Sequence, residues 1–344
     1  MKKLIDKLFN TSNLSDEELL LLLEDNSEDE YLREKAEIKR KEVYENKVYI
    51  RGLIEISNYC KNNCLYCGIR AGNKEASRYR LSTEDILACC EMGYEAGFRT
   101  FVLQGGEDPK QDDDFVINTV KKIKEKYPDC AVTLSVGEKS FESYKKYKDA
   151  GADRYLLRHE TAEKCHYSKL HPENMSFENR MRCLKDLKRL GYQVGCGIMV
   201  GSPYQDINCI IKDLRFIKEF DPQMVGIGPF IPHKDTPFKE EKAGSVEFTL
   251  KLLSIIRLML PKVLLPATTA LGTISKDGRS RGILAGANVI MPNLSPKAAR
   301  EKYMLYNNKL NTGIESVEGL NALKQSMEEI GYEVTVDRGD YKAL

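Results

Sequence analysis

Short apolar runs alternate with amphipathic segments along most of the chain. Helix signals separate the runs: Ser82, Ser176 and Asp206 stand at N-cap positions, and Gly97 and Gly191 end the first two of these helices. Short strands that alternate with helices of this length predict parallel βαβ units. The runs that we interpret as strands are residues 48–56, 100–104, 131–135, 154–158, 193–199, 224–229, 263–267 and 288–291.

The number of units indicates the fold class. Eight such units over roughly 250 residues match the size of a (β/α)₈ barrel, so we expect an α/β protein with a complete TIM barrel. An open, doubly wound sheet is the alternative, because periodicity does not show whether a sheet closes. Helical patterns come first, and Ser15 and Glu18 form a capping box there. We expect a helical extension at residues 1–45, the barrel at 46–300, and a helical tail packed on it at 301–344.

Charge balance and cysteine content narrow the class of protein. The 53 Lys and Arg residues nearly cancel the 52 Asp and Glu residues, which gives no electrostatic reason to expect a nucleic-acid partner. Residues 1–10 lack the continuous apolar core of a signal peptide, and apolar runs such as 19–23 are too short to span a membrane. Ten cysteines then indicate thiols or metal ligands in a reducing compartment. We expect a cytoplasmic protein without a membrane segment.

Three cysteines follow the first predicted strand in "ISNYCKNNCLYCGIRAGN", with the spacing C-x₃-C-x₂-C at Cys60, Cys64 and Cys67. A structural zinc site needs four ligands, and here the fourth would have to come from a distant residue. Thiolates equally suit iron–sulfur clusters, and three of them leave one iron open. This spacing resembles that of radical S-adenosylmethionine (SAM) enzymes. In those enzymes the open iron of a [4Fe–4S] cluster binds SAM, and an electron from the cluster cleaves SAM to a 5′-deoxyadenosyl radical.

Other residues at predicted strand ends suggest the rest of a SAM pocket, since functional residues of a barrel follow the carboxyl ends of its strands. The segment "GGEDP" resembles the glycine–glycine–glutamate motif that holds the SAM amino group in this superfamily. Glu160 suits the ribose hydroxyls, because a carboxylate accepts two hydrogen bonds. Arg180 suits the SAM carboxylate, with a surface ion pair as the alternative. The other expected cofactor-binding residues are Tyr66 beside adenine, Gln104, Gly105, Gly106, Glu107, Ser135, Arg158 and Met199.

A further group of residues is expected to face a substrate inside the barrel. Arg158 and His159 end the fourth strand in an occluded cavity, where a buried arginine needs an anionic substrate or a neighbouring acid. Thr268 and Thr269 offer hydroxyls that orient a substrate without adding charge. Met291, Tyr303 and Tyr306 either wall the cavity or belong to the core, with the two tyrosines at i, i+3 spacing on a helix. Buried, unreactive thiols are expected at Cys89, Cys90, Cys130, Cys165, Cys183, Cys196 and Cys209.

Several longer motifs together resemble one family over residues 10–335. "CKNNCLYCG", "LQGGEDP", "ADRYLLRHETA", "PQMVGIGPFIPHKDTP", "LLPATTALGT" and "GANVIMPNLSP" are similar to segments of HydE, a family of radical SAM maturases of [FeFe]-hydrogenase. Biotin synthase and methylornithine synthase are more distantly similar. The resemblance implies a barrel of the radical SAM type that holds one [4Fe–4S] cluster and SAM. It also implies radical attack on the sulfur of a cysteine-bound iron–carbonyl–cyanide substrate.

The resemblance also implies partners: a flavodoxin- or ferredoxin-type electron donor and other hydrogenase maturases. Some family members carry a second cluster on cysteines of the C-terminal part. Here no cysteine follows Cys209, so we expect a single cluster. A related radical SAM enzyme, such as a methylornithine synthase-like mutase, is the alternative function. A cluster scaffold without catalysis is disfavoured because it has no use for a SAM pocket.

Overall fold

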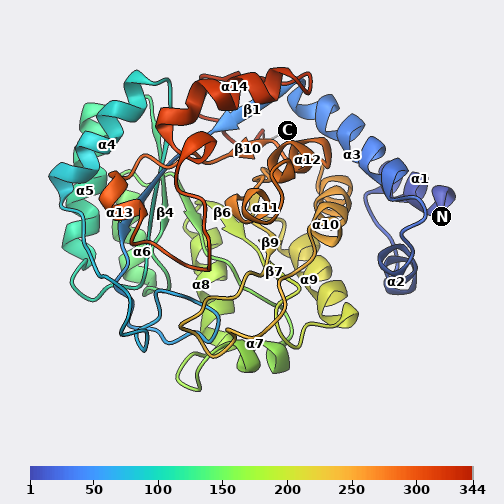
Figure 1. The fold of residues 1–344 in the computed structure, drawn as a ribbon, viewed down its shortest axis with the longest axis horizontal. Coiled ribbons are helices and arrows are strands. Elements are labelled where there is room, and N and C mark those ends of the chain that lie inside the picture. Colours follow the sequence, from blue (N-terminus) through green and yellow to red (C-terminus); the bar gives the residue numbers. More distant parts are fainter. Residues whose placement is uncertain (343–344) are drawn as a thin grey trace.

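A computed structural model describes residues 1–342 of the chain, and three helices open it (Figure 1). They are α1 (Lys2–Thr11), α2 (Asp16–Glu24) and α3 (Asp29–Tyr44). Ser15 and Glu18 form the predicted capping box of α2. In this arrangement α3 packs along α10 (Val246–Met259), and α2 packs against α9 (Ile207–Phe220). The extension therefore covers one side of the main body, along α9 and α10.

A parallel sheet of six strands forms the centre of the main body. Its order is β2 (Gly52–Ser57), β3 (Thr100–Gly105), β4 (Ala131–Ser135), β5 (Arg154–Leu156), β6 (Gln193–Cys196) and β8 (Met224–Val225). Every neighbouring pair runs parallel. The predictions for 100–104 and 131–135 are confirmed to within one residue.

Helices cover the outer face of this sheet, and their starts follow the predicted caps. The side chains of Ser82, Ser176 and Asp206 accept hydrogen bonds from the first turns of their helices, and Gly97 and Gly191 follow α4 and α8 in left-handed backbone. Fully buried apolar residues of these helices pack on the strands in one extended core. The helices are α4 (Thr83–Glu95), α5 (Asp113–Lys126), α6 (Phe141–Asp149), α7 (Lys164–Leu170) and α8 (Phe177–Arg189), followed by α9.

Three predicted strands are interrupted in the structure. The run 48–56 divides at Arg51 into β1 (Lys47–Ile50) and β2, and β1 lies between β10 (Val289–Ile290) and β11 (Glu333–Thr335). The runs 193–199 and 224–229 divide because their backbones approach closely: a Cβ on Gly197 would lie 2.0 Å from the carbonyl oxygen of Gly226. Beyond this point β7 (Met199–Val200) pairs with β9 (Gly228–Pro229).

The predicted strand at 263–267 is reduced to single bridges. Leu264 pairs with Met224, and Pro266, which has no N–H to donate, pairs with Val289. A further bridge joins Leu53 of β2 to Asn293. The named strands thus form sheets of six, three and two strands, which isolated bridges connect.

The C-terminal part is only partly the helical tail that we expected. After α11 (Thr269–Ile274), α12 (Gly278–Leu284) and α13 (Lys297–Arg300), residues 301–312 are irregular. Two short 3₁₀ turns follow, Gly313–Glu315 and Val317–Gly319, and then α14 (Leu320–Glu328) and β11. The prediction that Tyr303 and Tyr306 lie on a helix is therefore wrong. Among the residues described, no helix is both long enough and apolar enough to cross a lipid bilayer.

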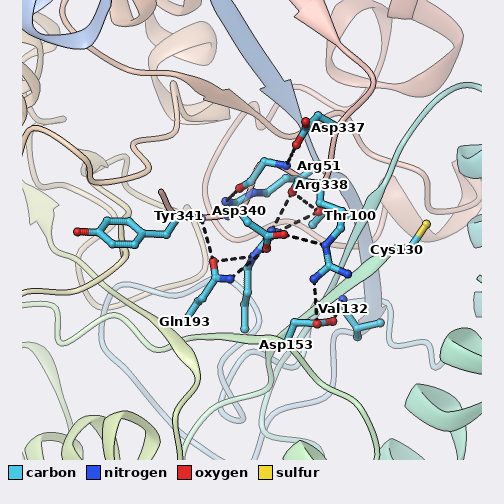
Figure 2. A network of polar contacts seen from close by, with 12 residues as sticks. Arg51, Thr100, Cys130, Val132, Asp153, Gln193, Asp337, Arg338, Asp340 and Tyr341 are labelled. Carbon is cyan, nitrogen blue, oxygen red and sulfur yellow. Dashed lines mark hydrogen bonds and ion pairs between the residues drawn. The ribbon is translucent and has the colours of Figure 1, made fainter. Parts of the chain in front are cut away.

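The last described residues close the amino-terminal end of the central sheet (Figure 2). Arg154 is fully buried and donates to Asp340 Oδ1 at 2.6 Å and to the Arg338 carbonyl at 2.8 Å. Thr100 donates to the same carbonyl at 2.8 Å, and Arg338 pairs with Asp153 at 3.0 Å. These contacts lie at the starts of β3 and β5, so the opposite end of the strands is left for the functional site.

Candidate functional site

One cavity of about 350 Å³ lies at the carboxyl ends of the strands. This volume falls within the range of small-molecule sites. With the exception of His159, the structure brings the residues of the two predicted sets, for the cofactors and for the substrate, to its wall: Cys60, Cys64, Tyr66, Cys67, Gln104, Gly105, Gly106, Glu107, Ser135, Arg158, Glu160, Arg180, Met199, Thr268, Thr269, Met291, Tyr303 and Tyr306.

The three cysteines lie on the irregular segment that follows β2, residues 58–79, which we call the cysteine loop, and their thiols are free and half-buried. Burial, together with the neighbouring Cys60, raises the pKa of Cys67 to about 12. Burial also raises the pKa of Cys60. Within residues 1–342 no three His, Cys, Asp or Glu residues lie close enough to hold a single metal ion. A [4Fe–4S] cluster needs no such convergence, because each thiolate binds a different iron atom.

The "GGEDP" segment lies directly against the cysteine loop. The Lys61 N–H donates to the Glu107 carbonyl at 2.9 Å, and the Lys61 ammonium lies 3.3 Å from the Glu107 carboxylate. A Cβ on Gly106 would lie only 2.2 Å from the Tyr59 carbonyl oxygen. Arg80, the residue that follows the cysteine loop, adds an ion pair to Asp108 of the "GGEDP" segment at 2.6 Å. The backbone contact explains why a glycine is required at position 106.

Tyr66 is fixed by a histidine that we did not single out from the sequence. The Tyr66 hydroxyl lies 3.2 Å from His171 Nε2, and His171 Nδ1 lies 2.9 Å from the Tyr167 carbonyl oxygen. Burial, with the nearby Arg180, lowers the pKa of His171 to about 3, so the ring is neutral. Because Nδ1 donates to the carbonyl, Nε2 accepts from Tyr66.

Glu160 occupies a strained backbone position at the cavity wall. Its φ is 65°, in the left-handed region that non-glycine residues rarely adopt. The residue is held by a hydrogen bond from its N–H to the Gly197 carbonyl at 3.0 Å, and its carboxylate pairs with Arg158 at 2.9 Å. Strain of this kind persists where the surrounding structure enforces it, and it is concentrated at functional sites.

Arg180 and His159 lie differently from what we expected. Arg180 is buried and pairs with Glu138 at 2.5 Å, so the alternative of a surface ion pair is wrong. His159 is fully buried but faces Asp213 at 3.4 Å, on α9 outside the cavity. Its prediction as a cavity residue is wrong because successive residues of an extended segment point to opposite faces. Arg158 therefore faces inward and His159 outward.

The model of the Radical SAM superfamily matches residues 54–217. An [FeFe] hydrogenase maturase subunit HydE from Thermotoga maritima is 51% identical over 80% of this chain and 78% of that protein. The chain belongs to the HydE family.

Two solved structures have the same fold as this HydE-family chain. A methylornithine synthase (PylB) superposes with a TM-score of 0.85 and 30% identity, covering 96% of this chain and 97% of that one. HydG, a maturase of the [FeFe]-hydrogenase, gives a TM-score of 0.79 at 23% identity, covering 96% and 74%. The chain is thus a radical SAM enzyme with an α/β fold and a parallel central sheet, whose cofactors are a [4Fe–4S] cluster and SAM.

The inner part of the cavity of this HydE-family enzyme carries hydroxyls and a buried ion pair. The Thr269 hydroxyl donates to Glu315 at 2.9 Å, whereas Thr268 Oγ1 has no hydrogen-bond partner among the described residues. Lys309 pairs with Glu55 at 2.7 Å, and both line the cavity. Burial raises the pKa of Glu55, and the Lys309 ammonium opposes that rise.

Sequence reasoning missed this ion pair, although half of it left a signal. Glu55 lies in the apolar strand "GLIEIS", where a lone carboxylate at an inward position requires a partner. Lys309 lies in an irregular segment and had no comparable signal.

Among the seven remaining cysteines the prediction of buried thiols is confirmed for six, and it is wrong for Cys165, which is exposed.

Proposed function

We propose that this enzyme takes part in building the active-site H-cluster of [FeFe]-hydrogenase. Its substrate in the cavity is a sulfur-containing unit, a cysteine-derived iron–carbonyl–cyanide complex. The observation that carries this proposal is the single cavity shared by the cysteine loop and the polar inner residues, in a chain 51% identical to a HydE. When bound, the cluster supplies the electron that cleaves SAM to a 5′-deoxyadenosyl radical.

The outer half of the cavity provides the cofactor contacts in this proposal. Cys60, Cys64 and Cys67 hold the cluster through their thiolates, since soft ligands suit iron–sulfur centres. The Glu160 carboxylate accepts hydrogen bonds from the ribose hydroxyls of SAM, and the backbone contact to Gly197 holds the residue rigidly. Arg180 uses Nε for Glu138 and Nη1 for the Arg158 carbonyl, which leaves Nη2 to donate to the SAM carboxylate. Tyr66, Gln104, Gly105, Gly106, Glu107, Ser135 and Met199 complete this set.

The inner half orients the substrate. Arg158 is 33% exposed at its side chain and, within residues 1–342, pairs with only one carboxylate, so its guanidinium can still bind an anionic group. The Thr268 hydroxyl, which has no hydrogen-bond partner among the described residues, supplies a neutral hydrogen bond from the wall of the same cavity. Met291, Tyr303 and Tyr306 exclude water around the reacting sulfur. Tyr303 is 2% exposed and accepts a hydrogen bond from Gln104 at 3.4 Å.

We also propose that the sheet closes into a complete (β/α)₈ barrel. The bridges Met224–Leu264, Pro266–Val289 and Leu53–Asn293 run in the order that a closed barrel requires. The corresponding units are an extension at 1–45, the barrel at 46–300 and a tail at 301–344. A flavodoxin- or ferredoxin-type donor and other maturases are its proposed partners, and ten free thiols support a reducing, cytoplasmic setting.

A mutase of the methylornithine synthase type is the second candidate, favoured by the 30% identical structure with a TM-score of 0.85. The test is anaerobic reconstitution followed by reductant, SAM and either an iron–cysteine complex or lysine, an isomer of 3-methylornithine. 5′-Deoxyadenosine and new paramagnetic species with the iron–cysteine complex support the maturase, and consumption of lysine supports the mutase. Cys64→Ser protein serves as the inactive control.

A further inference from the structure

Arg78 closes the cysteine loop, residues 58–79, from its carboxyl end. Nη1 donates to the carbonyl oxygens of Asn58 at 2.5 Å and Ile69 at 2.8 Å. Nη2 donates to those of Arg70 at 2.7 Å and Asn73 at 2.9 Å. Four backbone carbonyls from three parts of the loop thus converge on one guanidinium.

The carbonyls that Arg78 binds flank the outer two cysteines. Asn58 precedes Cys60 by two residues, and Ile69 follows Cys67 by two. One side chain therefore sets the distance between the backbone before the first cysteine and the backbone after the last. A planar guanidinium with five donors suits this task, whereas an ammonium has three donors and no fork.

Asn58 supports the same closure from the other end of the loop. Its Nδ2 donates to the Ser77 and Lys302 carbonyls, each at 2.8 Å. Its Oδ1 accepts from the Tyr79 N–H at 2.8 Å. These contacts fix where the loop starts and ends, and Arg78 fixes its interior.

The charge of Arg78 is not neutralised by the protein. Within residues 1–342 no carboxylate forms an ion pair with its half-buried guanidinium, although its neighbour Arg80 pairs with Asp108. An uncompensated positive charge beside the cysteine loop favours the more negative, reduced form of a bound cluster. Net charge near an iron–sulfur cluster is one of the factors that set its reduction potential.

We propose that Arg78 is a positioning residue that holds the cysteine loop in its cluster-binding conformation and raises the reduction potential of the bound cluster. The proposal concerns the step common to radical SAM enzymes, so it does not depend on which substrate occupies the inner cavity.

The test compares Arg78→Met with Arg70→Met as a matched control. Arg70 belongs to the same loop and carries the same charge, but among the residues described its side chain makes only one hydrogen bond within the loop, from Nη2 to the Asn63 carbonyl at 3.2 Å. The measurements are amide exchange of the cluster-free protein, iron per chain after anaerobic reconstitution, and a redox titration followed by electron paramagnetic resonance. A thermal melt checks that each variant is folded.

In Arg78→Met we expect the backbone amide hydrogens of residues 58–79 to exchange about tenfold faster, or more, than in the wild type, with exchange in the rest of the chain unchanged. This variant should bind less iron, and the cluster that remains should have a more negative potential. Arg70→Met should load iron like the wild type.

Arg78→Lys separates the two roles and also serves if Arg78→Met does not fold. It keeps the charge, so loss of iron with an unchanged potential in the residual cluster supports the proposal. Full iron content and wild-type potential in a folded Arg78→Met protein would overturn the proposal. Equal losses in Arg70→Met would overturn it as well.

Discussion

Replacing Gly106 by alanine tests how tightly the "GGEDP" segment is fitted to the cysteine loop. The added Cβ would lie 2.2 Å from the Tyr59 carbonyl oxygen and 2.8 Å from Cys60 Cβ. Real Cβ atoms do not approach closer than 3.0 Å, so the backbone before Cys60 must retreat by at least 0.8 Å, the difference between 3.0 and 2.2 Å. Overpacking of this kind costs about 1–3 kcal/mol. A displacement near 1 Å at a site lowers its activity about 10²-fold.

The neighbouring glycine provides the control. A Cβ on Gly105 would meet Ile56 Cγ1 at 3.1 Å and the Ser57 carbonyl oxygen at 3.3 Å, which requires shifts of only a few tenths of an ångström. We expect Gly106→Ala to lose cluster occupancy and SAM cleavage after anaerobic reconstitution, and Gly105→Ala to keep most of both. Iron analysis and 5′-deoxyadenosine production measure the difference. Wild-type iron content and SAM cleavage in Gly106→Ala would refute this reasoning.

Three further predictions follow from the site and the closed end of the sheet. Cys64→Ser should abolish both cluster binding and 5′-deoxyadenosine formation, because serine is a hard ligand; retained turnover would contradict the cluster assignment. Glu160→Ala should leave the iron content unchanged and weaken SAM binding by about 1–3 kcal/mol, since the ribose hydroxyls lose their acceptor; isothermal titration of the reconstituted protein measures this, and an unchanged affinity would make Glu160 structural. Although burial raises the pKa of Asp340, Arg154 and Arg338 lower it to about 2, below the unfolded value of about 3.9. The stabilisation by Asp340 is therefore present above about pH 4 and is lost as the pH falls towards 2. Asp340→Asn should be less stable at pH 7 and match the wild type near pH 2 in chemical unfolding, and a difference independent of pH would exclude the ion pair as its cause.

Local signals in the sequence predicted the helices well. Ser82, Ser176 and Asp206 form their caps with backbone N–H groups three residues away, so short-range chemistry decides where those helices begin. The strand breaks have a different origin. Gly197 and Gly226 come together from separate runs. Arg51 lies where the chain leaves the three-stranded sheet of β1 and enters the six-stranded sheet of β2. Contacts between distant segments determine these breaks, and periodicity along one run does not contain them.

The same distinction applies to the candidate site. The cysteines and the "GGEDP" segment could be selected because their chemistry is unusual at its sequence spacing. The sequence did not show whether the His159 side chain points into the cavity or away from it, since this direction depends on where the strand before it ends. Lys309 reaches Glu55 across 254 positions of sequence. Arg78 binds backbone carbonyls, which every residue carries, so the identity of its partners leaves no signal in the sequence. Partners of this kind become visible only when the backbone path is known.

The contacts between the cysteine loop and residues 302–305 have a consequence for synthesis of the protein. Asn58 donates to the Lys302 carbonyl, and the Gly68 N–H donates to the Leu305 carbonyl at 2.8 Å. These partners leave the ribosome about 240 residues after the loop, which at about 5–20 residues per second takes roughly 12–48 s. During that time the nascent chain presents three thiols without the segment that walls them in. Iron delivered during that time would meet a loop that lacks these contacts.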